Sequence, residues 1–170
     1  TLKRLREASH AVGLHALESY RTRDRAVPEV RIGLLDIAAH AAPEESREVL
    51  VELISTYGDD LGLRKSACFF LASTSPEAAA DLLGPIIVDA DRNRTYPPNG
   101  SMLRAYIEAM EALDRDPTEL LTTVAVDIKQ EQEARHLAVE TLGEIPSSAG
   151  RQALEALIVE SAGNSYIRRK

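Results

Sequence analysis

The chain has 170 residues, of which 44% are hydrophobic and 28% are charged, and its net charge is −7 at pH 7. It is therefore long enough to bury a substantial core and too acidic for general binding to nucleic-acid phosphates, which depends on basic residues. Aromatic residues make up only 4% of the chain, and no long segment alternates between polar and apolar residues, which argues against a β-sheet protein.

The cysteine count and the hydropathy of the sequence further limit the class of protein to which the chain can belong. The single cysteine, Cys68, allows no internal disulfide bond, and its apolar neighbours predict a small buried core residue. The chain shows no signal peptide and no apolar run of membrane-spanning length. We expect a cytoplasmic helical protein that does not enter a membrane.

The first predicted helix spans residues 2–22. Its apolar residues recur at steps of three to five residues, close to the helical period; they are Leu2, Leu5, Ala8, Val12 and Leu17. Gly13 is a weak point, because glycine has a low helix propensity. We interpret this helix as the second half of an incomplete helix pair, and a polar connection over residues 22–28 follows it.

Four pairs of shorter helices come next, each with a first helix, a tight turn and a second helix. The second helices begin at a proline, which is tolerated in the first turn because its missing N–H would be unpaired there. In the third pair Asp116 is placed to cap the second helix, whose predicted apolar face is Leu120, Leu121, Val124 and Ile128. The predicted bounds are 29–40 with 43–57, 63–74 with 76–88, 101–113 with 117–130, and 132–145 with 146–161.

One pattern recurs in all four pairs: an apolar residue, three intervening residues, a second apolar residue and then a proline. The copies are Leu34…Ala38…Pro43, Ala67…Leu71…Pro76, Ala109…Leu113…Pro117 and Ala138…Leu142…Pro146. Their first residues lie 33, 42 and 29 residues apart, and periods of about 20–50 residues are typical of repeat arrays. Three residues before the first position stand Arg31, Arg64 and Arg135, with Tyr106 in the third copy.

This pattern resembles the HEAT-repeat family, in its short bacterial variety of roughly 30 residues per unit. The Ala-x-x-x-Leu of the first helix, the turn with proline and the upstream arginine carry the resemblance, which covers residues 29–170. It implies an all-α fold, a right-handed superhelix (solenoid) of about four helical hairpins plus a leading helix.

The expected domain organisation follows from this pattern. We predict a single helical-repeat domain over residues 1–170, with the leading helix and connection at 1–28. The repeats fall at 29–62, 63–100, 101–131 and 132–165, and a further unit starts at 166–170. Because the array opens inside one unit and closes at the start of another, we expect the chain to be a segment of a longer protein.

Two segments depart from regular repeats. Gly84-Pro85 interrupts a second helix, so we expect either a kink there or a helix that stops at Leu83 and restarts. The irregular segment over residues 89–100 begins like a calcium loop, but Arg94 and Gly100 stand where that loop needs glycine and glutamate. We therefore expect no metal there and interpret the segment as a loop that adds binding specificity.

No pattern of catalytic residues or metal ligands is evident. Each of the four histidines is followed by alanine or leucine, and none has a convincing ligand at metal-site spacing; they are His10, His15, His40 and His136. We expect no catalytic residue, no metal and no cofactor. Whether the chain is an enzyme stays open, and the sequence favours a non-catalytic protein.

The second helices supply the predicted binding surface, because in stacked hairpins they line the concave side. The candidate residues on these helices and on the 89–100 loop are Glu48, Glu52, Asp81, Arg151, Glu155, Arg92, Arg94 and Tyr96. Their mildly acidic character predicts a protein or peptide partner with basic character. The expected function is protein–protein interaction or scaffolding.

Two alternatives stay open. The first is an enzyme or a lyase-like cofactor-binding module on the same scaffold. The second is contact with nucleic acid through the first helix, because residues 1–25 carry a net charge of +3 while the remainder of the chain carries −10.

Overall fold

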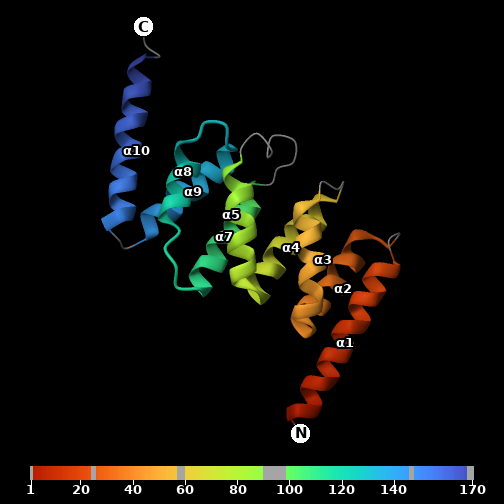
Figure 1. Ribbon diagram of the computed structural model, residues 1–170. Coiled ribbons are helices and arrows are strands. Elements are labelled where there is room, and N and C mark those ends of the chain that lie inside the picture. The colour runs from red at the N-terminus through yellow and green to blue at the C-terminus, as the bar shows by residue number, and fades with distance from the viewer. Residues whose placement is uncertain (1, 24–25, 57–59, 90–98, 146–147, 168–170) are drawn as a thin grey trace. The chain divides into compact units, whose positions relative to one another are not determined.

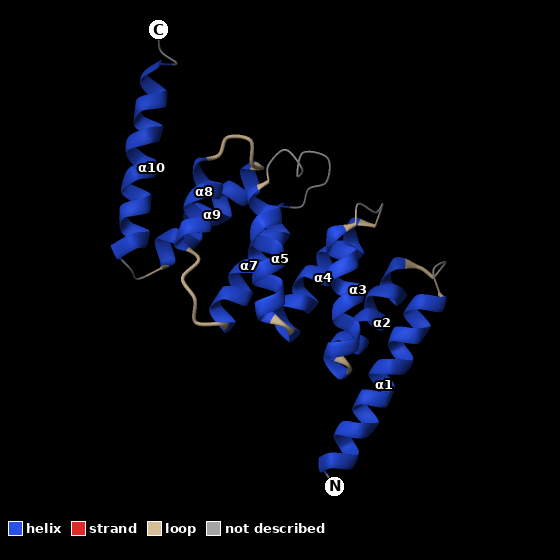
Figure 2. Cartoon of the chain, in the orientation of Figure 1, coloured by secondary structure: helices blue, strands red, loops and turns tan. Residues whose placement is uncertain are grey.

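The computed structural model describes residues 2–23, 26–56, 60–89, 99–145 and 148–167. Every regular element in these ranges is an α-helix (Figure 2), which confirms the predicted all-α class. The helices, labelled as in Figure 1, are α1 (Leu2–Thr22), α2 (Pro28–Ala41), α3 (Pro43–Ser55), α4 (Leu61–Thr74), α5 (Pro76–Val88), α7 (Asn99–Ala112), α8 (Thr118–Val126), α9 (Gln132–Glu144) and α10 (Ser148–Ile167).

The chain divides into two compact units, Thr1–Leu83 and Gly84–Lys170, and the division falls inside α5. In the first unit α1 packs along α2, while α3 and α4 pack against each other and against α2 (Figure 1). In the second unit α9 packs against α7, α8 and α10. Each unit thus buries the apolar faces of its helices against its own neighbours.

The recurring pattern identifies core residues in both units. The alanine and leucine positions that are fully or almost fully buried are Ala38, Ala67, Leu71, Ala109, Ala138 and Leu142. Two predicted positions are only partly buried, Leu34 and Leu113. In α2 the fully buried leucine is Leu35, which lies three and four residues before the fully buried Ala38 and Ala39 and so shares their helix face.

The turns inside the first two helix pairs have the same backbone conformation. Ala42 links α2 to α3 with φ −140° and ψ 64°, and Ser75 links α4 to α5 with φ −149° and ψ 67°. Each donates its N–H to the carbonyl four residues earlier at 2.8 Å, and Pro43 or Pro76 follows as the first residue of the next helix. The predicted unit of helix, tight turn and proline-led helix is therefore confirmed in these two pairs.

The third pair has a different turn. After α7, Asp114 adopts a left-handed backbone with φ 53°. The N–H of Arg115 donates to the carbonyl of Met110 at 2.9 Å, and the N–H of Asp114 donates to the carbonyl of Glu111 at 3.1 Å. These two bonds form a Schellman motif, which ends a helix by satisfying its last carbonyls. The pair consequently has a longer connection than the first two.

Helix α8 is shorter than predicted. The Asp116 carboxylate accepts a hydrogen bond from the N–H of Thr118 at 2.9 Å, so it caps the helix as expected, although the helix begins after Pro117. At the other end Asp127 is extended with ψ 106°, and the helix stops at Val126. The prediction that Ile128 lies on the apolar face is wrong: its side chain is 82% exposed because it lies beyond the helix end.

Helix α5 continues through Pro85 and ends at Val88. The alternative that it stops at Leu83 is therefore wrong. A proline inside a helix leaves the carbonyl four residues earlier, here that of Asp81, without its usual donor. Both Asp81 and Pro85 are exposed, so water can satisfy that carbonyl, and the helix tolerates the proline.

Gly13 is the closest approach between α1 and the α2–α3 turn. A Cβ atom at this position would lie 2.7 Å from the backbone nitrogen of Ala42 and 2.8 Å from the carbonyl carbon of Ala41. Only glycine allows the two backbones to come so close. Its low helix propensity is thus offset by the packing that it permits.

The upstream arginines connect consecutive helices. Arg64 of α4 donates Nε–H to the carbonyl of Ile54 in the last turn of α3 at 3.0 Å, and Arg135 of α9 donates to the carbonyl of Ala125 in the last turn of α8 at 3.2 Å. Both acceptors lie ten residues before the arginine. Helix C-termini carry unpaired carbonyls and a partial negative charge, so each guanidinium stabilises the end of the preceding helix.

The copy that lacks this arginine uses another donor. Tyr106 stands at the corresponding position, and the carbonyl of Ile87 near the end of α5 accepts a hydrogen bond from Nε2 of Gln130 at 2.9 Å. Gln130 is only 5% exposed. The buried side-chain amide of Gln130 thus supplies a donor to the end of α5, as the arginines do for α3 and α8.

Substitution of Gly13 should be destabilising although alanine normally favours a helix. We expect Gly13→Ala to lower the free energy of unfolding by about 1–3 kcal/mol, because backbone atoms must move to admit the Cβ. Gly33 of α2 is the matched control, since nothing lies within 4 Å of its Cβ position; Gly33→Ala should raise stability by about 0.5–1 kcal/mol. Urea denaturation followed by circular dichroism measures both, and equal stabilisation by the two alanines would contradict the close approach.

Removal of the two arginines should have unequal effects. Arg64 is 5% exposed whereas Arg135 is only partly buried. Arg64→Met should therefore lower the free energy of unfolding by about 1.5–3 kcal/mol, the contribution of a hydrogen bond to a charged group, and Arg135→Met should lower it by less. Urea denaturation of both variants tests the order, and a larger loss for Arg135→Met would show that these bonds are not what stabilises the helix ends.

Candidate binding site

The first unit contains a hollow between α1 and α3. Its volume is about 490 Å³, and its lining residues are Tyr20, Arg21, Glu48, Val49, Glu52, Leu53 and Thr56. We call it the α1–α3 hollow. Tyr20 and Arg21 belong to the last turn of α1, and the others belong to α3 and the residue that follows it. A volume in the range of about 300–1,000 Å³ is typical of ligand sites.

Two carboxylates face this hollow. Glu48 and Glu52 are four residues apart on α3, which places them on one helix face. Both are exposed, and neither forms an ion pair with any residue in the described ranges. Like charges at this spacing repel each other by about 0.2–0.5 kcal/mol, so a bound cation would relieve their repulsion.

The helix ends add to the negative potential. Tyr20 and Arg21 lie in the last turn of α1, and Glu52, Leu53 and Thr56 lie at the end of α3, whereas Glu48 and Val49 lie in the middle of α3. A helix C-terminus carries about half a negative charge. Against this stands one cationic lining residue, Arg21. The guanidinium of Arg64 already bonds to the α3 C-terminus, and that of Arg31 lies beside Tyr20. The excess of negative charge in the hollow therefore rests on the two carboxylates, opposed by Arg21.

Tyr20 and Arg31 form a fixed pair beside the hollow. The Tyr20 side chain is 6% exposed, and its hydroxyl accepts a hydrogen bond from Nη2 of Arg31 at 3.1 Å. The Arg31 guanidinium also lies 4.9 Å from the centre of the Tyr20 ring, within the range of a cation–π interaction. The Nε of Arg31 is buried without a hydrogen-bond partner in the described structure, so Tyr20 provides its main polar contact.

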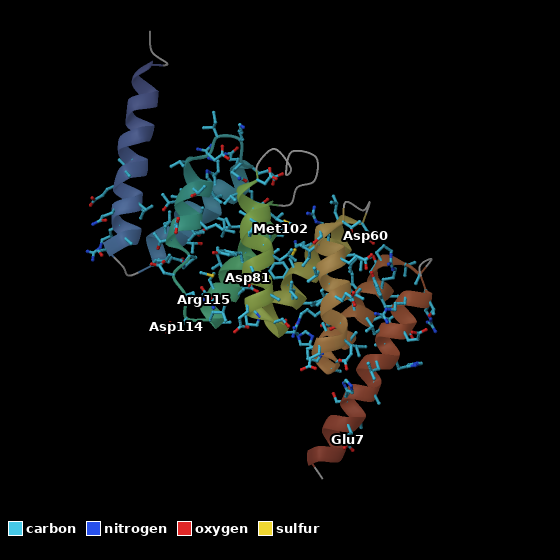
Figure 3. All side chains as sticks on the ribbon, in the orientation of Figure 1. Glu7, Asp60, Asp81, Met102, Asp114 and Arg115 are labelled. Atoms are coloured by element: carbon cyan, nitrogen blue, oxygen red, sulfur yellow. The ribbon has the colours of Figure 1, made fainter. Side chains whose placement is uncertain are left out.

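The pKa of the Tyr20 phenol is raised above its ordinary value. Burial is the main cause, and the negative charges of Asp60 and Glu52 raise it further, while Arg31 lowers it. Glu52 has the smallest of these effects, so the phenol is only weakly coupled to the carboxylates of the hollow. Figure 3 marks Asp60, which caps α4 by accepting a hydrogen bond from the N–H of Leu63 at 3.0 Å.

At the other end of α3, Glu45 is already paired. Its carboxylate lies 3.2 Å from Nε2 of His10 on α1. Glu45, Glu48 and Glu52 follow each other at helical spacing along α3, and only the first of them has a partner on α1. Glu48 and Glu52 instead line the α1–α3 hollow together with Arg21, without an ion pair among the described residues.

The structure brings together only two of the residues predicted from sequence, Glu48 and Glu52. Asp81 is exposed on α5 (Figure 3) and does not line the hollow. Arg151 and Glu155 are exposed on α10, in the second unit. The three loop residues predicted to contribute, Arg92, Arg94 and Tyr96, lie outside the described residues, as does most of the calcium-loop-like segment.

Sequence reasoning missed five lining residues: Tyr20, Arg21, Val49, Leu53 and Thr56. A signal for Tyr20 existed, since it lies three residues after the buried Leu17 and so continues the apolar face of α1. Val49 and Leu53 repeat the four-residue spacing of the two glutamates one position later. Nothing in the sequence showed that the ends of α1 and α3 would meet.

Other chemistry finds little support elsewhere in the described structure. There, no three side chains of the metal-ligating types gather closely enough to hold an ion. Cys68 is fully buried, as predicted, and burial raises the pKa of its thiol to about 12, so the thiol is not reactive. The alternative of nucleic-acid contact depends on the basic residues among the first 25. Of these, Arg21 lines the hollow and Arg23 is exposed.

Two further observations concern membrane-spanning helices and the similarity of this chain to known proteins. No helix in the described ranges has the length and apolar content needed to cross a membrane. Comparison with protein-family models, with curated proteins and with solved structures yields no match for this chain.

Removal of the Tyr20 hydroxyl should weaken the first unit in a pH-dependent way. Tyr20→Phe takes away the acceptor of Arg31 and should lower the free energy of unfolding by about 1 kcal/mol near neutral pH. Because the folded pKa of Tyr20 exceeds its unfolded value, this tyrosine contributes full stability below the unfolded pKa and loses it as the pH rises through the folded one.

The stability of the unmodified chain should therefore fall as the pH rises above about 10, the pKa of tyrosine in the unfolded chain, and the fall should be smaller in Tyr20→Phe. Urea midpoints across this range measure it. Tyr106→Phe is the control, since the pKa of Tyr106 is also raised by burial and its removal should reduce the slope too. If the stability of Tyr20→Phe fell with pH as steeply as that of the unmodified chain, Tyr20 would not be a cause of the alkaline loss of stability.

Proposed function

We propose that this chain is a non-catalytic, HEAT-like helical-repeat module that recognises another protein, as a scaffold or as an arm of a larger protein. The identical Ala42 and Ser75 turns and the two arginines that bond to preceding helix ends support a repeat origin. We further propose that the helix pairs stack as a right-handed superhelix, the arrangement that such short repeats adopt.

The observation that carries the binding function is the α1–α3 hollow. It presents two carboxylates without ion-pair partners among the described residues, next to the apolar side chains of Val49 and Leu53. Charges that are already balanced serve solubility, whereas an unbalanced pair in a concave site favours a complementary ligand. We therefore propose that the partner contributes a basic segment.

The geometry suits an extended segment better than a folded domain. A hollow of about 490 Å³ has the size of a small-ligand site, so it can admit a few side chains of a partner but not a folded domain. Affinity from so few contacts is modest, so we expect binding in the micromolar range or weaker.

The proposal predicts selective binding of basic peptides. A fluorescein-labelled peptide of alternating arginine and serine should raise the fluorescence anisotropy when the protein is added, and a matched peptide of alternating glutamate and serine should not. Binding should weaken as salt rises from about 50 to about 200 mM, because exposed charges are screened.

Charge-reversal variants distinguish peptide binding at the α1–α3 hollow from nonspecific attraction to the negative net charge of the chain. Glu48→Arg/Glu52→Arg should abolish binding of the basic peptide. The matched control is Glu108→Arg/Glu140→Arg, which changes the net charge equally at exposed positions of the second unit and should retain most of the affinity. Equal loss in the two variants would show that binding follows net charge and would overturn the proposed site.

A further inference from the structure

Helix α2 carries a second apolar row besides the one that it buries. The row recurs at alternating steps of three and four residues, the spacing of a helix–helix seam; its members are Val27, Val30, Leu34, Ile37 and Ala41. We call it the α2 stripe. Val30 and Ile37 near its centre are 43% and 45% exposed. A helix that is apolar on two sides is normally covered on both, so the exposure of this stripe calls for a partner surface.

The α2 stripe lies roughly opposite the contact of α2 with α4. The Ile32 side chain points to α4, because its Cδ1 atom is 3.9 Å from the position that a Cβ atom of Gly62 would take. At about 100° per residue, the stripe lies about 140–220° around the helix from Ile32. Helix α4 therefore leaves the stripe uncovered.

The equivalent row in the next helix pair packs against a helix. Three residues of the stripe have equivalents 33 residues later, in α4: Leu63 for Val30, Ala67 for Leu34 and Phe70 for Ile37. Leu63 and Ala67 are buried, and the Phe70 ring meets the ring of His40 on α2 edge-on, with centroids 6.1 Å apart. The equivalence indicates that the α2 stripe is likewise a surface for packing against a helix.

Within this chain the best complement to the stripe is the stripe itself. Among the described helices, α2 alone carries a row of exposed large apolar residues, whereas on the others such residues stand singly or on different sides. No charged residue belongs to the stripe, and Glu29 and Asp36 of α2 lie roughly 100° or more around the helix from its centre line. Two copies of an acidic chain can therefore meet there without facing like charges.

Two-fold symmetry suits this surface. A two-fold axis through the middle of the stripe pairs α2 with its copy in antiparallel orientation. Antiparallel helices place the negative end of each dipole beside the positive end of the other. Gly33 borders the middle of the stripe, and nothing lies within 4 Å of its Cβ position. The two backbones can thus approach closely around the axis.

We infer that the α2 stripe is a self-association surface, at which two copies of the chain pair through antiparallel α2 helices. The few side chains of the stripe cover less than the roughly 800 Å² per partner of a standard interface, so the dimer is weak and forms at high protein concentration. The inference is independent of the proposed peptide binding, because the stripe and the α1–α3 hollow share no residue.

Sedimentation velocity of the purified chain tests the inference. The average mass should rise from the 18.6 kDa of the monomer towards twice that value between about 10 and about 500 μM protein, because dimerisation follows mass action. Ile37→Glu and Val30→Glu should each weaken association at least about tenfold, since each places a charge in an apolar interface. Val139→Glu, at an exposed valine of α9, is the control and should associate like the unmodified chain.

Disulfide cross-linking tests where the two copies meet. Cys68, the single cysteine of the chain, is fully buried, so an introduced cysteine decides the result. Oxidation of Gly33→Cys should yield a covalent dimer, because near the two-fold axis this residue meets its own copy within the about 7 Å between Cα atoms that a disulfide spans. Gly143→Cys, at an exposed glycine of α9, is the matched control and should cross-link much more slowly.

A dimer that both glutamate variants of the stripe weaken, and that cross-links preferentially through Gly33→Cys, supports the inference. Circular dichroism should show the same helix content for these variants as for the unmodified chain, because the substituted positions are exposed. A monomer at every concentration overturns the inference, as does a dimer that survives both glutamate variants. Cross-linking of Gly143→Cys as fast as that of Gly33→Cys overturns the antiparallel pairing of α2.

Discussion

The close contact of α1 with the turn between α2 and α3 is the constraint on which the first unit depends. Gly13 brings the two backbones within a distance that no other residue permits. Once α1 is held there, His10 reaches Glu45 on one side and Tyr20 reaches Arg31 on the other. The C-terminal ends of α1 and α3 then lie close enough to enclose a hollow, so the candidate site is a consequence of how the leading helix packs.

The carbonyl groups at helix C-termini impose a second constraint on this chain. Each ends in carbonyls that need donors, and the chain supplies them in different ways: Arg64 and Arg135 by guanidinium groups, Gln130 by an amide, and Arg115 and Asp114 by backbone N–H groups. The positions of the two guanidinium groups coincide with a recurring position in the sequence. At Arg64 and Arg135 the arginine of the repeat pattern is therefore explained by the helix end that precedes it, whereas Arg31 bonds to the hydroxyl of Tyr20.

Much of the fold could be predicted from local physics. Helical periodicity and proline placement located most helix ends to within a few residues, because both act over one or two turns. The exception is α10, which continues to Ile167 although its end was predicted at residue 161 and a further unit at residue 166. Prediction failed where an end depends on tertiary context. Ile128 continues the apolar spacing of α8, yet the helix stops at Val126, and α5 passes Pro85 because the freed carbonyl lies on the exposed side.

The candidate site was predictable only in part, for a related reason. Glu48 and Glu52 stand out in the sequence as carboxylates on a second helix, and they line the hollow. Tyr20 and Arg21 come from a helix that lies about thirty residues away in sequence, and no short-range pattern tells which residues of α1 meet the end of α3. Asp81, Arg151 and Glu155, which are also in the predicted set, do not line the hollow, and their role in binding stays a prediction.

The central claim is that a basic partner segment binds in the α1–α3 hollow. Hydrogen–deuterium exchange measured with and without the arginine–serine peptide tests it most directly, because it reports on every helix at once. The account predicts slower exchange in the last turns of α1 and α3 and unchanged exchange in α7 to α10. Protection confined to the second unit, or absent from the ends of α1 and α3, would contradict it.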